Sequence, residues 1–594
     1  MKEKTLNYLK NTAVALVIIM SFLACISKTL TGFDIDESYA VVLPLRLIQG
    51  DIPFKDMWEV HQTSVFLPFI FVKLYSFFVP SFEGLVIFLR ICALIIHLII
   101  SIYLYFMIKK LFPETDKLIP FLFSAGYFNF FPKWMMNIDF SMEQLWFYTL
   151  LSVSLLLFFN EEDRKRKAVH MLLSGFFLAF DVLAYPGMLI LFPVIIVMLF
   201  KDNKRYIIHL ILGCFIPALV FMTFILLNMD VSSFIHSLTM VFMDGTHKFN
   251  FSQKLFLYGS QWARVLLEAL ILLAPAIPVS EVIIFILNRK INKDSADNSV
   301  KDEKERQNGD GFKLFAKNRL FMYMITFEIL WSAFIICAKL FVPWGPFRLQ
   351  TRYIIGFALV FPLVRILLNQ NLIRMFYLQL FAFVGILISS NVGPSSSSSY
   401  LVIGNLMFAS LLIEVTGKQV YSSQKHDIYR VLSITGAFLF IFSLIMCKGF
   451  YMRNTEYVPG DITAPLSKME VGPLKGIYVH TEDKERFTDN YDTIQANTTS
   501  DDQMLFMGTE TLSCIYGNGS FVIPTTISTP AFNEQWIAYF KENPDKIPTV
   551  VFIAKNTIDD RDLFFSEDPF GFFLEEYFDI SEMKETEYLC ILHR

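Results

Sequence analysis

Three carboxylates stand together where the first apolar segment of the chain ends. The segment runs from Thr12 to Leu30, and Asp34, Asp36 and Glu37 follow it directly. Charge at the edge of a bilayer costs free energy, so an acid retained there usually has a function. Such a carboxylate can act as a general base or bind a cation.

The acids open a loop that also contains Trp58 and His61 and then enters a second apolar stretch, Ser64–Val79. That stretch is short and contains Pro68 and Lys73, which favours an interfacial or re-entrant helix over a crossing one. A loop anchored in the bilayer at both ends would hold a site in place. The alternative is a solvated loop whose charges merely mark the interface.

A second acidic pair, Asp139 and Glu143, opens a later apolar segment. Residues four apart share one helical face, so both acids would point the same way. Asp139 could instead cap the helix, because acids are favoured at a helix start. Glu143 lies among apolar residues, where capping explains it less well.

Basic side chains supply the complementary charge. Arg90 lies on one helical face with Glu83 and His97, since these residues are spaced by seven. Charge within a membrane helix needs an anionic partner, either an acid such as Asp181 or a phosphate group of a ligand. We interpret His97 as an interior histidine with its hydrogen bonds satisfied.

Arg348, Arg352 and Tyr353 precede another apolar segment. Arginine grips phosphate through two parallel hydrogen bonds, so Arg352 and Tyr353 are candidates for substrate binding. Contact with lipid headgroups is the alternative. A phosphate among the predicted acids would need arginine or a divalent cation to bridge the charges.

Composition defines the class of protein that carries these residues. The chain has 594 residues, of which 54% are hydrophobic and 18% charged, and its mean hydropathy is +0.48. These values exclude a soluble globule and indicate a polytopic membrane protein. The net charge of −4 gives no reason to expect a nucleic-acid partner. No glycine-rich nucleotide loop is present, which argues against ATP-driven work.

About 20 apolar residues cross a bilayer, and this rule predicts about thirteen helices. The predicted spans are Thr12–Leu30, Gly84–Ile108, Lys117–Phe131, Met142–Asn160, Ala168–Tyr185, Gly187–Phe200, Tyr206–Asn228, Leu255–Leu287, Leu320–Leu340, Tyr353–Leu368, Leu372–Ser389, Leu401–Val415 and Val431–Cys447. Lysine and arginine gather in every second loop, which places those loops in the cytoplasm. The loop 31–83 and everything after Cys447 would then face outward.

Two polar regions complete the predicted organisation. Residues 288–319 form a cytoplasmic linker between helices of the membrane domain, 1–447. Residues 448–594 alternate short β-rich runs with helical ones, which predicts a small extracytoplasmic α/β domain. The predicted strands are Lys475–Val479, Gln503–Phe506, Ser520–Ile523 and Thr549–Ala554, and Glu534–Lys541 is a predicted helix.

The ordered set of motifs resembles a known family. The first helix, then Asp36-Glu37-Ser38-Tyr39-Ala40, then Gly50 to Asp56, His61 and Arg90, is similar to the GT-C fold glycosyltransferases. The nearest branch comprises bacterial relatives of the protein O-mannosyltransferases and the lipid A aminoarabinose transferase. Asp139 matches a second acid of that family, and Arg352-Tyr353 matches an Arg-Tyr pair before a late helix.

The resemblance implies an inverting transfer of a sugar from a polyprenyl-phosphate donor to an acceptor outside the cytoplasm. Asp36 would be the catalytic base or a metal contact, Glu37 would support it, and Asp139 would be the second acid or a further metal contact. His61, Arg90, Glu143, Arg352 and Tyr353 are the predicted substrate-binding residues. The sugar stays open, as does the acceptor, which could be a glycan, a lipid or a protein.

One departure concerns the donor phosphate. Many relatives carry His-Lys-Pro-Pro where this chain has His61-Gln62-Thr63-Ser64, so the lysine expected near the phosphate is missing. Arg90 or Arg352 would then supply that charge. A transporter or flippase of a lipid-linked saccharide is the main alternative function, because Pro186-Gly187 interrupts a membrane span. An inactive scaffold that binds cell-wall material is a third reading.

Overall fold

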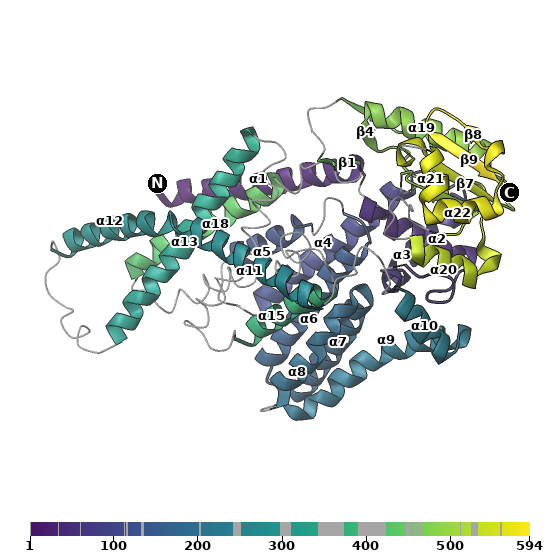
Figure 1. Ribbon diagram of the computed structural model, residues 1–594. Coiled ribbons are helices and arrows are strands. Elements are labelled where there is room, and N and C mark those ends of the chain that lie inside the picture. The colour runs from purple at the N-terminus through teal and green to yellow at the C-terminus, as the bar shows by residue number, and fades with distance from the viewer. Residues whose placement is uncertain are drawn as a thin grey trace.

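The computed structural model describes residues 2–33, 35–59, 61–111, 113, 117–131, 136–200, 203–241, 251–296, 310–341, 373–389, 423–446, 453–455, 458–459, 465–510, 512–523, 533–558 and 561–594. Helices fill the described chain up to residue 446, and the named strands all follow residue 452. The predicted combination of a polytopic helical part with a small C-terminal α/β part is confirmed (Figure 1).

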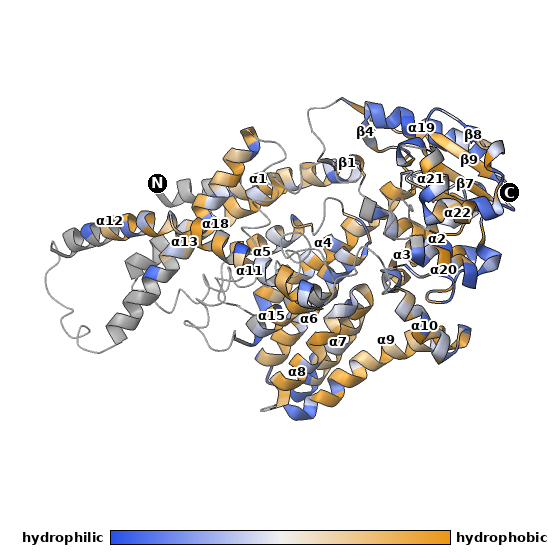
Figure 2. Ribbon diagram, viewed as in Figure 1, coloured by the Kyte–Doolittle hydropathy of each residue, from blue (hydrophilic) through white to orange (hydrophobic). Residues whose placement is uncertain are grey.

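Six described helices are long and apolar enough to cross a membrane. Their apolar stretches are Lys10–Leu30, Leu85–Leu111, Phe140–Asn160, Arg164–Ala184, Lys204–Asn228 and Met322–Phe341. They belong to α1 (Lys2–Leu30), α4 (Leu85–Leu111), α6 (Phe140–Asn160), α7 (Arg164–Ala184), α9 (Ile207–Asn228) and α13 (Asp310–Phe341). Figure 2 shows this most clearly for α7 and α9, which are mainly orange, the colour of hydrophobic residues.

Other described helices account for further predicted spans. They are α5 (Leu118–Phe128), α8 (Leu191–Phe200), α11 (Phe251–Leu273), α12 (Ala276–Ala296), α15 (Ile373–Ser389) and α18 (Ser423–Leu444). A further described helix is α10 (Val231–Val241). The predicted spans Tyr353–Leu368 and Leu401–Val415 lie outside the described residues. The helix α10 was not predicted, because its polar residues hide its apolar face.

The predicted single span Leu255–Leu287 is wrong. The structure divides it into α11 and α12, with a turn at Ala274 and Pro275. Proline has no N–H and its ring clashes with the preceding helical turn, so the helix ends there. A continuous helix of that length would also have exceeded the roughly 30 Å of a bilayer core.

Close packing joins α7 to α9. A Cβ atom added to Gly175 would lie 2.1 Å from the carbonyl oxygen of Leu210, and one added to Gly213 would lie 2.0 Å from that of Leu172. Only glycine allows the two backbones to approach this closely, as in many membrane helix pairs. The pair forms one wall of the bundle that also contains α6.

The first loop is folded rather than extended. A 3₁₀ turn, η1 (Ile35–Ser38), leads into α2 (Tyr39–Gln49), and a second turn, η2 (Gln62–Ser64), leads into α3 (Phe66–Phe78). The helix α2 ends at Gly50, whose φ of 100° lies in the left-handed region that favours glycine. At 13 residues α3 is too short to cross a bilayer.

The C-terminal part contains a five-stranded sheet in the order β6-β5-β7-β9-β8. The strands are β5 (Gln503–Met507), β6 (Ser520–Phe521), β7 (Val550–Ala554), β8 (Lys584–Glu585) and β9 (Leu589–His593). The strand β5 runs parallel to β6 and β7, and β9 runs antiparallel to β7 and β8. Parallel neighbours require crossover connections, which the intervening helices provide.

The helices of this part are α19 (Thr481–Ala496), α20 (Asn533–Glu542), α21 (Arg561–Glu567) and α22 (Pro569–Tyr577). Two small antiparallel pairs precede the sheet: β1 (Arg453–Thr455) with β2 (Val458–Pro459), and β3 (Leu466–Lys468) with β4 (Tyr478–His480). The predicted strands and the predicted helix Glu534–Lys541 correspond to β4 to β7 and α20.

This C-terminal part packs against the first loop (Figure 1). Gly32 donates its N–H to the carbonyl oxygen of Tyr478, and Gly84 donates to that of Gly472. Lys475 pairs with Glu83 at 2.7 Å. Both ends of the first loop are therefore fastened to the C-terminal part.

Candidate functional site

Arg90 joins the first loop to the membrane helices. Its side chain is fully buried in α4, and it binds Glu37 through two parallel hydrogen bonds, with Nε–Oε1 at 2.6 Å and Nη2–Oε2 at 2.7 Å. This bidentate geometry is the strongest form of a guanidinium–carboxylate contact. The acid that neutralises Arg90 is therefore Glu37 and not Asp181, the acid considered from the sequence.

The remaining donors of Arg90 cap the end of α1. Nη1 donates to the carbonyl oxygens of Lys28, Thr29 and Thr31 at 3.2–3.4 Å, and Nη2 donates to that of Gly32 at 2.7 Å. The last carbonyls of a helix lack intrahelical partners, and a cation there also complements the helix dipole. Protein groups thus engage all three nitrogens of Arg90, so a phosphate contact by this side chain would require some of these bonds to break.

Glu37 also connects two distant segments. Asn137 Nδ2 donates to Glu37 Oε1 at 3.0 Å, and Asn137 stands two residues before Asp139. The backbone of Asp36 lies in η1 beside Glu37. The turn that contains Asp36 and the loop that contains Asp139 are therefore neighbours. The side chain of Asp36 lies outside the described part, and its predicted role stays a prediction.

Asp139 caps α6. Its Oδ1 accepts hydrogen bonds from the backbone N–H groups of Ser141 and Met142 at 3.1 and 2.8 Å, and from the Ser141 hydroxyl at 2.8 Å. The capping alternative considered from the sequence is thus present, although it does not exclude a second role. Glu143 follows one turn later and is buried, and its Oε1 has no hydrogen-bond partner in the described structure.

His61 belongs to an aromatic cluster, Tyr39, His61, Phe140 and Tyr185, at the same end of the helices. Its ring stacks on Phe140 with centroids 3.4 Å apart and planes 5° from parallel. Tyr39 contacts both rings edge-on, and Tyr185 lies 6.0 Å from His61 and 6.3 Å from Phe140. The cluster therefore connects the first loop to the start of α6 and to the end of α7.

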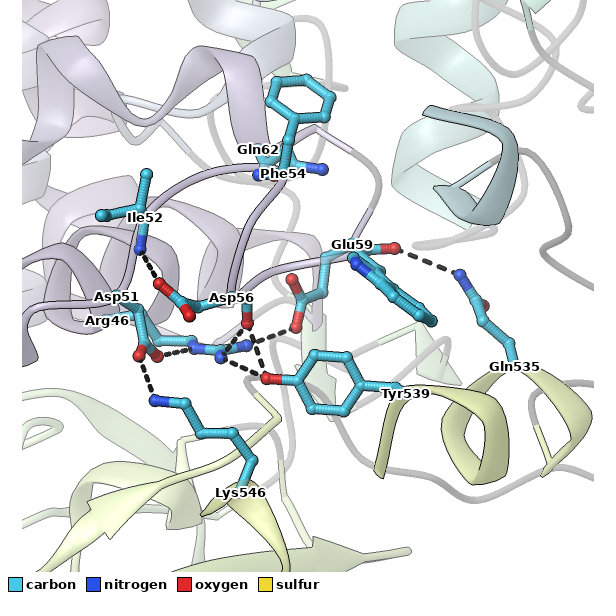
Figure 3. Close-up of polar contacts among 11 residues, drawn as sticks. Arg46, Asp51, Ile52, Phe54, Asp56, Glu59, Gln62, Gln535, Tyr539 and Lys546 are labelled. Carbon is cyan, nitrogen blue, oxygen red and sulfur yellow. Dashed lines mark hydrogen bonds and ion pairs between the residues drawn. The ribbon is translucent and has the colours of Figure 1, made fainter. Parts of the chain in front are cut away.

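A second buried arginine, Arg46 of α2, lies where the first loop meets α20 (Figure 3). Nε binds Asp51 at 2.5 Å, and Nη1 binds Glu59 at 2.7 Å. Nη2 donates to the carbonyl oxygen of Asp56 at 2.5 Å and to the Tyr539 hydroxyl at 3.1 Å. Residues of the first loop and of the C-terminal part thus share one guanidinium.

The contact extends on both sides of Arg46. Lys546 binds Asp51 at 2.5 Å, and Gln535 Nε2 donates to the carbonyl oxygens of Trp58 and Met240 at 3.2 and 2.9 Å. Burial raises the pKa of Glu59 to about 7, although the Arg46 guanidinium opposes the shift. Glu59 Oε2 and Trp58 Nε1 are buried and have no partner among the described residues.

His97 satisfies both ring nitrogens inside the bundle, as expected. Trp146 Nε1 donates to Nδ1 at 3.1 Å, which leaves Nε2–H to donate to the carbonyl oxygen of Tyr127 at 3.1 Å. Asp181 is buried in α7 without a hydrogen-bond partner for either carboxyl oxygen in the described structure. Arg352 and Tyr353 lie outside the described residues, and their substrate-binding role stays a prediction.

The predicted metal contacts find no further support in the described atoms. Within the described residues, no group of three or more His, Cys, Asp and Glu side chains could hold a metal ion. Oδ1 of Asp139 is already engaged in capping α6. A metal bound by Asp36 and Asp139 stays a prediction.

Several important residues were not predicted from the sequence. Arg46 was hidden in a stretch that looked amphipathic, although a lone arginine followed by Asp51 and Glu59 could have indicated an ion pair. Asn137 carries no charge and was not predicted to contact Glu37. Gln144, which is buried beside Glu143, gave no signal apart from its place in an apolar segment.

No family model matches the chain, and no curated protein matches it. Among solved structures, the chain is similar to ArnT from Cupriavidus metallidurans in the apo state. The two chains are 9% identical, the match covers 100% of this chain and 98% of that chain, and the TM-score is 0.41. At this TM-score the likeness carries no argument about function, which must come from the residues themselves.

Proposed function

We propose that the protein is a GT-C type membrane glycosyltransferase that moves a sugar from a polyprenyl-phosphate donor to an acceptor outside the cytoplasm. The main support is the contact of Glu37 with Arg90 and Asn137. This contact fixes the turn of Asp36 beside the loop of Asp139, where the family resemblance places its catalytic acids.

In the proposed reaction, the Asp36 carboxylate accepts the proton of an acceptor hydroxyl. The hydroxyl oxygen forms a bond to the anomeric carbon from the face opposite the phosphate. The bond between that carbon and the phosphate oxygen breaks, and polyprenyl phosphate leaves with both electrons. Attack from the opposite face inverts the anomeric configuration. Glu37 and Arg90 act as positioning residues, because they hold the turn without reaching the reacting atoms.

The orientation of the site is also part of the proposal. The carboxylates lie where α1 and α4 meet the first loop, whereas Lys109, Lys110 and Arg164 stand at the opposite ends of α4 and α7. Basic residues favour the cytoplasmic side of a membrane. We therefore place the site and the C-terminal part outside the cytoplasm of a multi-pass membrane protein.

The donor phosphate needs a cationic group in this scheme. The donors of Arg90 are engaged within the protein, which favours Arg352 for this contact. A divalent metal ion is the other proposed source of charge, because it would neutralise the departing phosphate. Addition of a chelator distinguishes the two, since a chelator leaves an arginine contact intact.

The test is to incubate the purified full-length protein with a panel of polyprenyl-phosphate sugars and membrane acceptors and to measure released polyprenyl phosphate. We expect release with at least one donor, and we expect Asp36→Asn to abolish it while the protein keeps its thermal unfolding temperature. Asp56→Asn is the matched control, because Asp56 is an acid of the same loop outside the proposed site. Unchanged turnover by Asp36→Asn would remove Asp36 from the chemistry.

A transporter or flippase is the second candidate, and the buried carboxyl of Asp181 favours it. A carboxyl within a membrane helix that lacks a partner in the described structure is a common feature of transport pathways, and Pro186 opens the η3 turn (Pro186–Ile190) directly after α7. A transporter would move the intact lipid-linked saccharide across vesicles without release of polyprenyl phosphate. The same assay, with the donor enclosed in vesicles, separates the two functions.

A further inference from the structure

The helices α6 and α7 pack on each other, and both carry buried polar side chains with atoms that have no hydrogen-bond partner among the described residues. Glu143, Gln144 and Asp181 have exposed fractions of 3%, 0% and 0%. Both amide atoms of Gln144, both carboxyl oxygens of Asp181 and Oε1 of Glu143 have no hydrogen-bond partner among the described residues. We call these three side chains the seam triad.

Two aromatic contacts place the seam triad at one depth. Phe140, the first residue of α6, contacts Tyr185 directly after α7, with ring centroids 6.3 Å apart. Deeper in the bundle, Phe147 of α6 stacks on Phe180 of α7 at 5.0 Å. Residues 140, 143, 144 and 147 recur with the spacing of one helical face, so this face of α6 lies toward α7.

Asp181 occupies the matching level of α7. It stands four residues before Tyr185, as Glu143 and Gln144 stand three and four residues after Phe140, so all three lie about 5–6 Å below the upper aromatic contact. Gln144 and Asp181 share this level without a direct hydrogen bond to each other. A group placed between them could bind both.

Burial of the seam triad without hydrogen-bond partners would cost free energy. A buried amide or hydroxyl without a partner costs about 1–3 kcal/mol, and a carboxyl group costs more. A membrane helix offers no bulk water to reduce this cost. Three such side chains in one place therefore indicate that a polar group binds there when the protein works.

The chemistry of the seam triad fits sugar hydroxyls. Carboxyl oxygens accept hydrogen bonds from hydroxyl groups, and the Gln144 amide can both donate and accept. A phosphate oxygen is itself an acceptor, so a group that carries hydroxyl donors matches these carboxyl oxygens better than a phosphate does. Above the triad, the rings of Tyr39, His61, Phe140 and Tyr185 provide apolar surface of the kind that lines most small-molecule sites.

We propose that the seam triad is a subsite that binds sugar hydroxyls, either of the lipid-linked donor or of a glycan acceptor. This inference rests on the proposed glycosyltransferase function. It assigns to Glu143, Gln144 and Asp181 the recognition of the sugar, whereas the turn of Asp36 carries the chemistry.

The binding test uses native mass spectrometry of the full-length protein with two probes, a polyprenyl-phosphate hexose and the polyprenyl phosphate that lacks the sugar. We expect the wild type to prefer the sugar-bearing lipid. Asp181→Leu and Gln144→Leu should each reduce that preference about tenfold for each hydrogen bond lost. Because the replaced groups have no described protein partner, both variants should unfold at or above the wild-type temperature.

Ser152→Ala is the matched control, since Ser152 is also buried in α6 with an unpartnered hydroxyl but lies deeper in the helix. It should leave the preference unchanged. If the leucine variants do not fold, Asp181→Asn and Gln144→Glu keep the shape of the side chains and test the same contacts.

The possible sources of the sugar give different results. A lost lipid preference identifies the donor sugar, whereas an unchanged preference with a raised KM for a glycan acceptor identifies the acceptor. If the wild type transfers a sugar and the leucine variants change neither quantity, the seam triad binds only water and the inference is wrong. If the wild type releases no polyprenyl phosphate but still prefers the sugar-bearing lipid, the proposed transfer fails and the subsite stands.

Discussion

Arg46 and Arg90 are both fully buried and both bind carboxylates of the first loop, but they join that loop to different parts of the protein. Arg90 lies in a membrane helix and engages one carboxylate, Glu37, together with backbone carbonyls at the end of α1. Arg46 lies in the loop itself and engages two carboxylates and the Tyr539 hydroxyl of α20.

The two regions also differ in how completely their polar groups are bound. At Arg90, both carboxyl oxygens of Glu37 accept hydrogen bonds. At Arg46, Glu59 Oε2 and Trp58 Nε1 have no partner in the described structure. A fully bonded buried network holds one geometry, whereas a partly bonded one is the weaker point of a fold. We infer that Arg90 fixes the site and that Arg46 forms a contact that can open.

The largest expected effect is that of Arg90→Leu. It removes the partner of a buried carboxylate, which costs about 3–5 kcal/mol, and it also leaves the last carbonyls of α1 without donors. We expect a large fall in the thermal unfolding temperature of the detergent-solubilised protein and loss of sugar transfer. Glu37→Gln should restore part of the stability to the Arg90→Leu protein. If the protein with Arg90→Leu alone unfolds at the wild-type temperature, the structural role of Arg90 is contradicted.

Arg46→Leu should act locally. Loss of the guanidinium leaves Glu59 without its described cationic partner, but Asp51 keeps its ion pair with Lys546. We therefore expect the substitution to weaken this contact by about 3 kcal/mol, the lower end of the range for breaking a buried ion pair. The C-terminal part should detach from the first loop while the membrane helices remain folded. Limited proteolysis would show faster cleavage near α20 at an unchanged far-ultraviolet helix signal. Equal protection in the variant and the wild type would show that other contacts hold the two parts together.

The sequence predicted the environment of Arg90 better than that of Arg46. The depth of Arg90 in an apolar segment required an anionic partner, and one was found. Its identity was not predictable, because Glu37 and Asp181 are both acids near the same surface and a single sequence contains no information about which residue pairs with which.

Arg46 was not predicted, and the reason is physical. Residues Ser38 to Leu47 look amphipathic, so their polar residues would be expected to face solvent. The structure instead buries Arg46 beneath α20, which lies almost 500 residues further along the chain. Local periodicity reports that one face of a helix is polar, but it does not report whether a distant domain covers that face.

The same limit applies to the candidate site. The acids at the ends of apolar segments were visible because charge there is expensive. The sequence analysis predicted a substrate-binding role only for Glu143 of the seam triad. Gln144 lacks a charge, and Asp181 was considered as a partner for Arg90. A pattern shows which residues are unusual, and the packing of α6 on α7 is needed to show which of them share a level.

A smaller effect is expected for Asn137→Ala. The substitution removes one hydrogen bond to a charged group, worth about 1.5–3 kcal/mol, but Glu37 keeps both bonds to Arg90. If Asn137 holds the loop of Asp139 beside η1, turnover should fall more than stability, with little change in KM for the donor. Asn129→Ala is the control, because the Asn129 amide donates to the Ser21 hydroxyl and to the carbonyl oxygen of Ala125, neither of which belongs to the predicted site. An equal fall of turnover in both variants would argue for a general loss of packing.

The smallest effect concerns pH at the Arg46 contact. Burial raises the pKa of Glu59 to about 7 from its ordinary value of 4.5. A group whose pKa is higher in the folded protein binds more protons there, so its contribution to stability is complete below pH 4.5 and is lost as pH rises through about 7. Docking of the C-terminal part should therefore be stronger at pH 6 than at pH 8, by on the order of 1 kcal/mol. Hydrogen exchange at α20, corrected for the intrinsic pH dependence, measures this difference.

Glu59→Gln should remove this pH dependence, whereas Asp545→Asn, which alters an acid near Lys546, should not. Asp51, Tyr539, Lys546 and His236 also face this contact, so a pH dependence that survives Glu59→Gln would assign the effect to one of them and leave Arg46 as a fixed contact like Arg90.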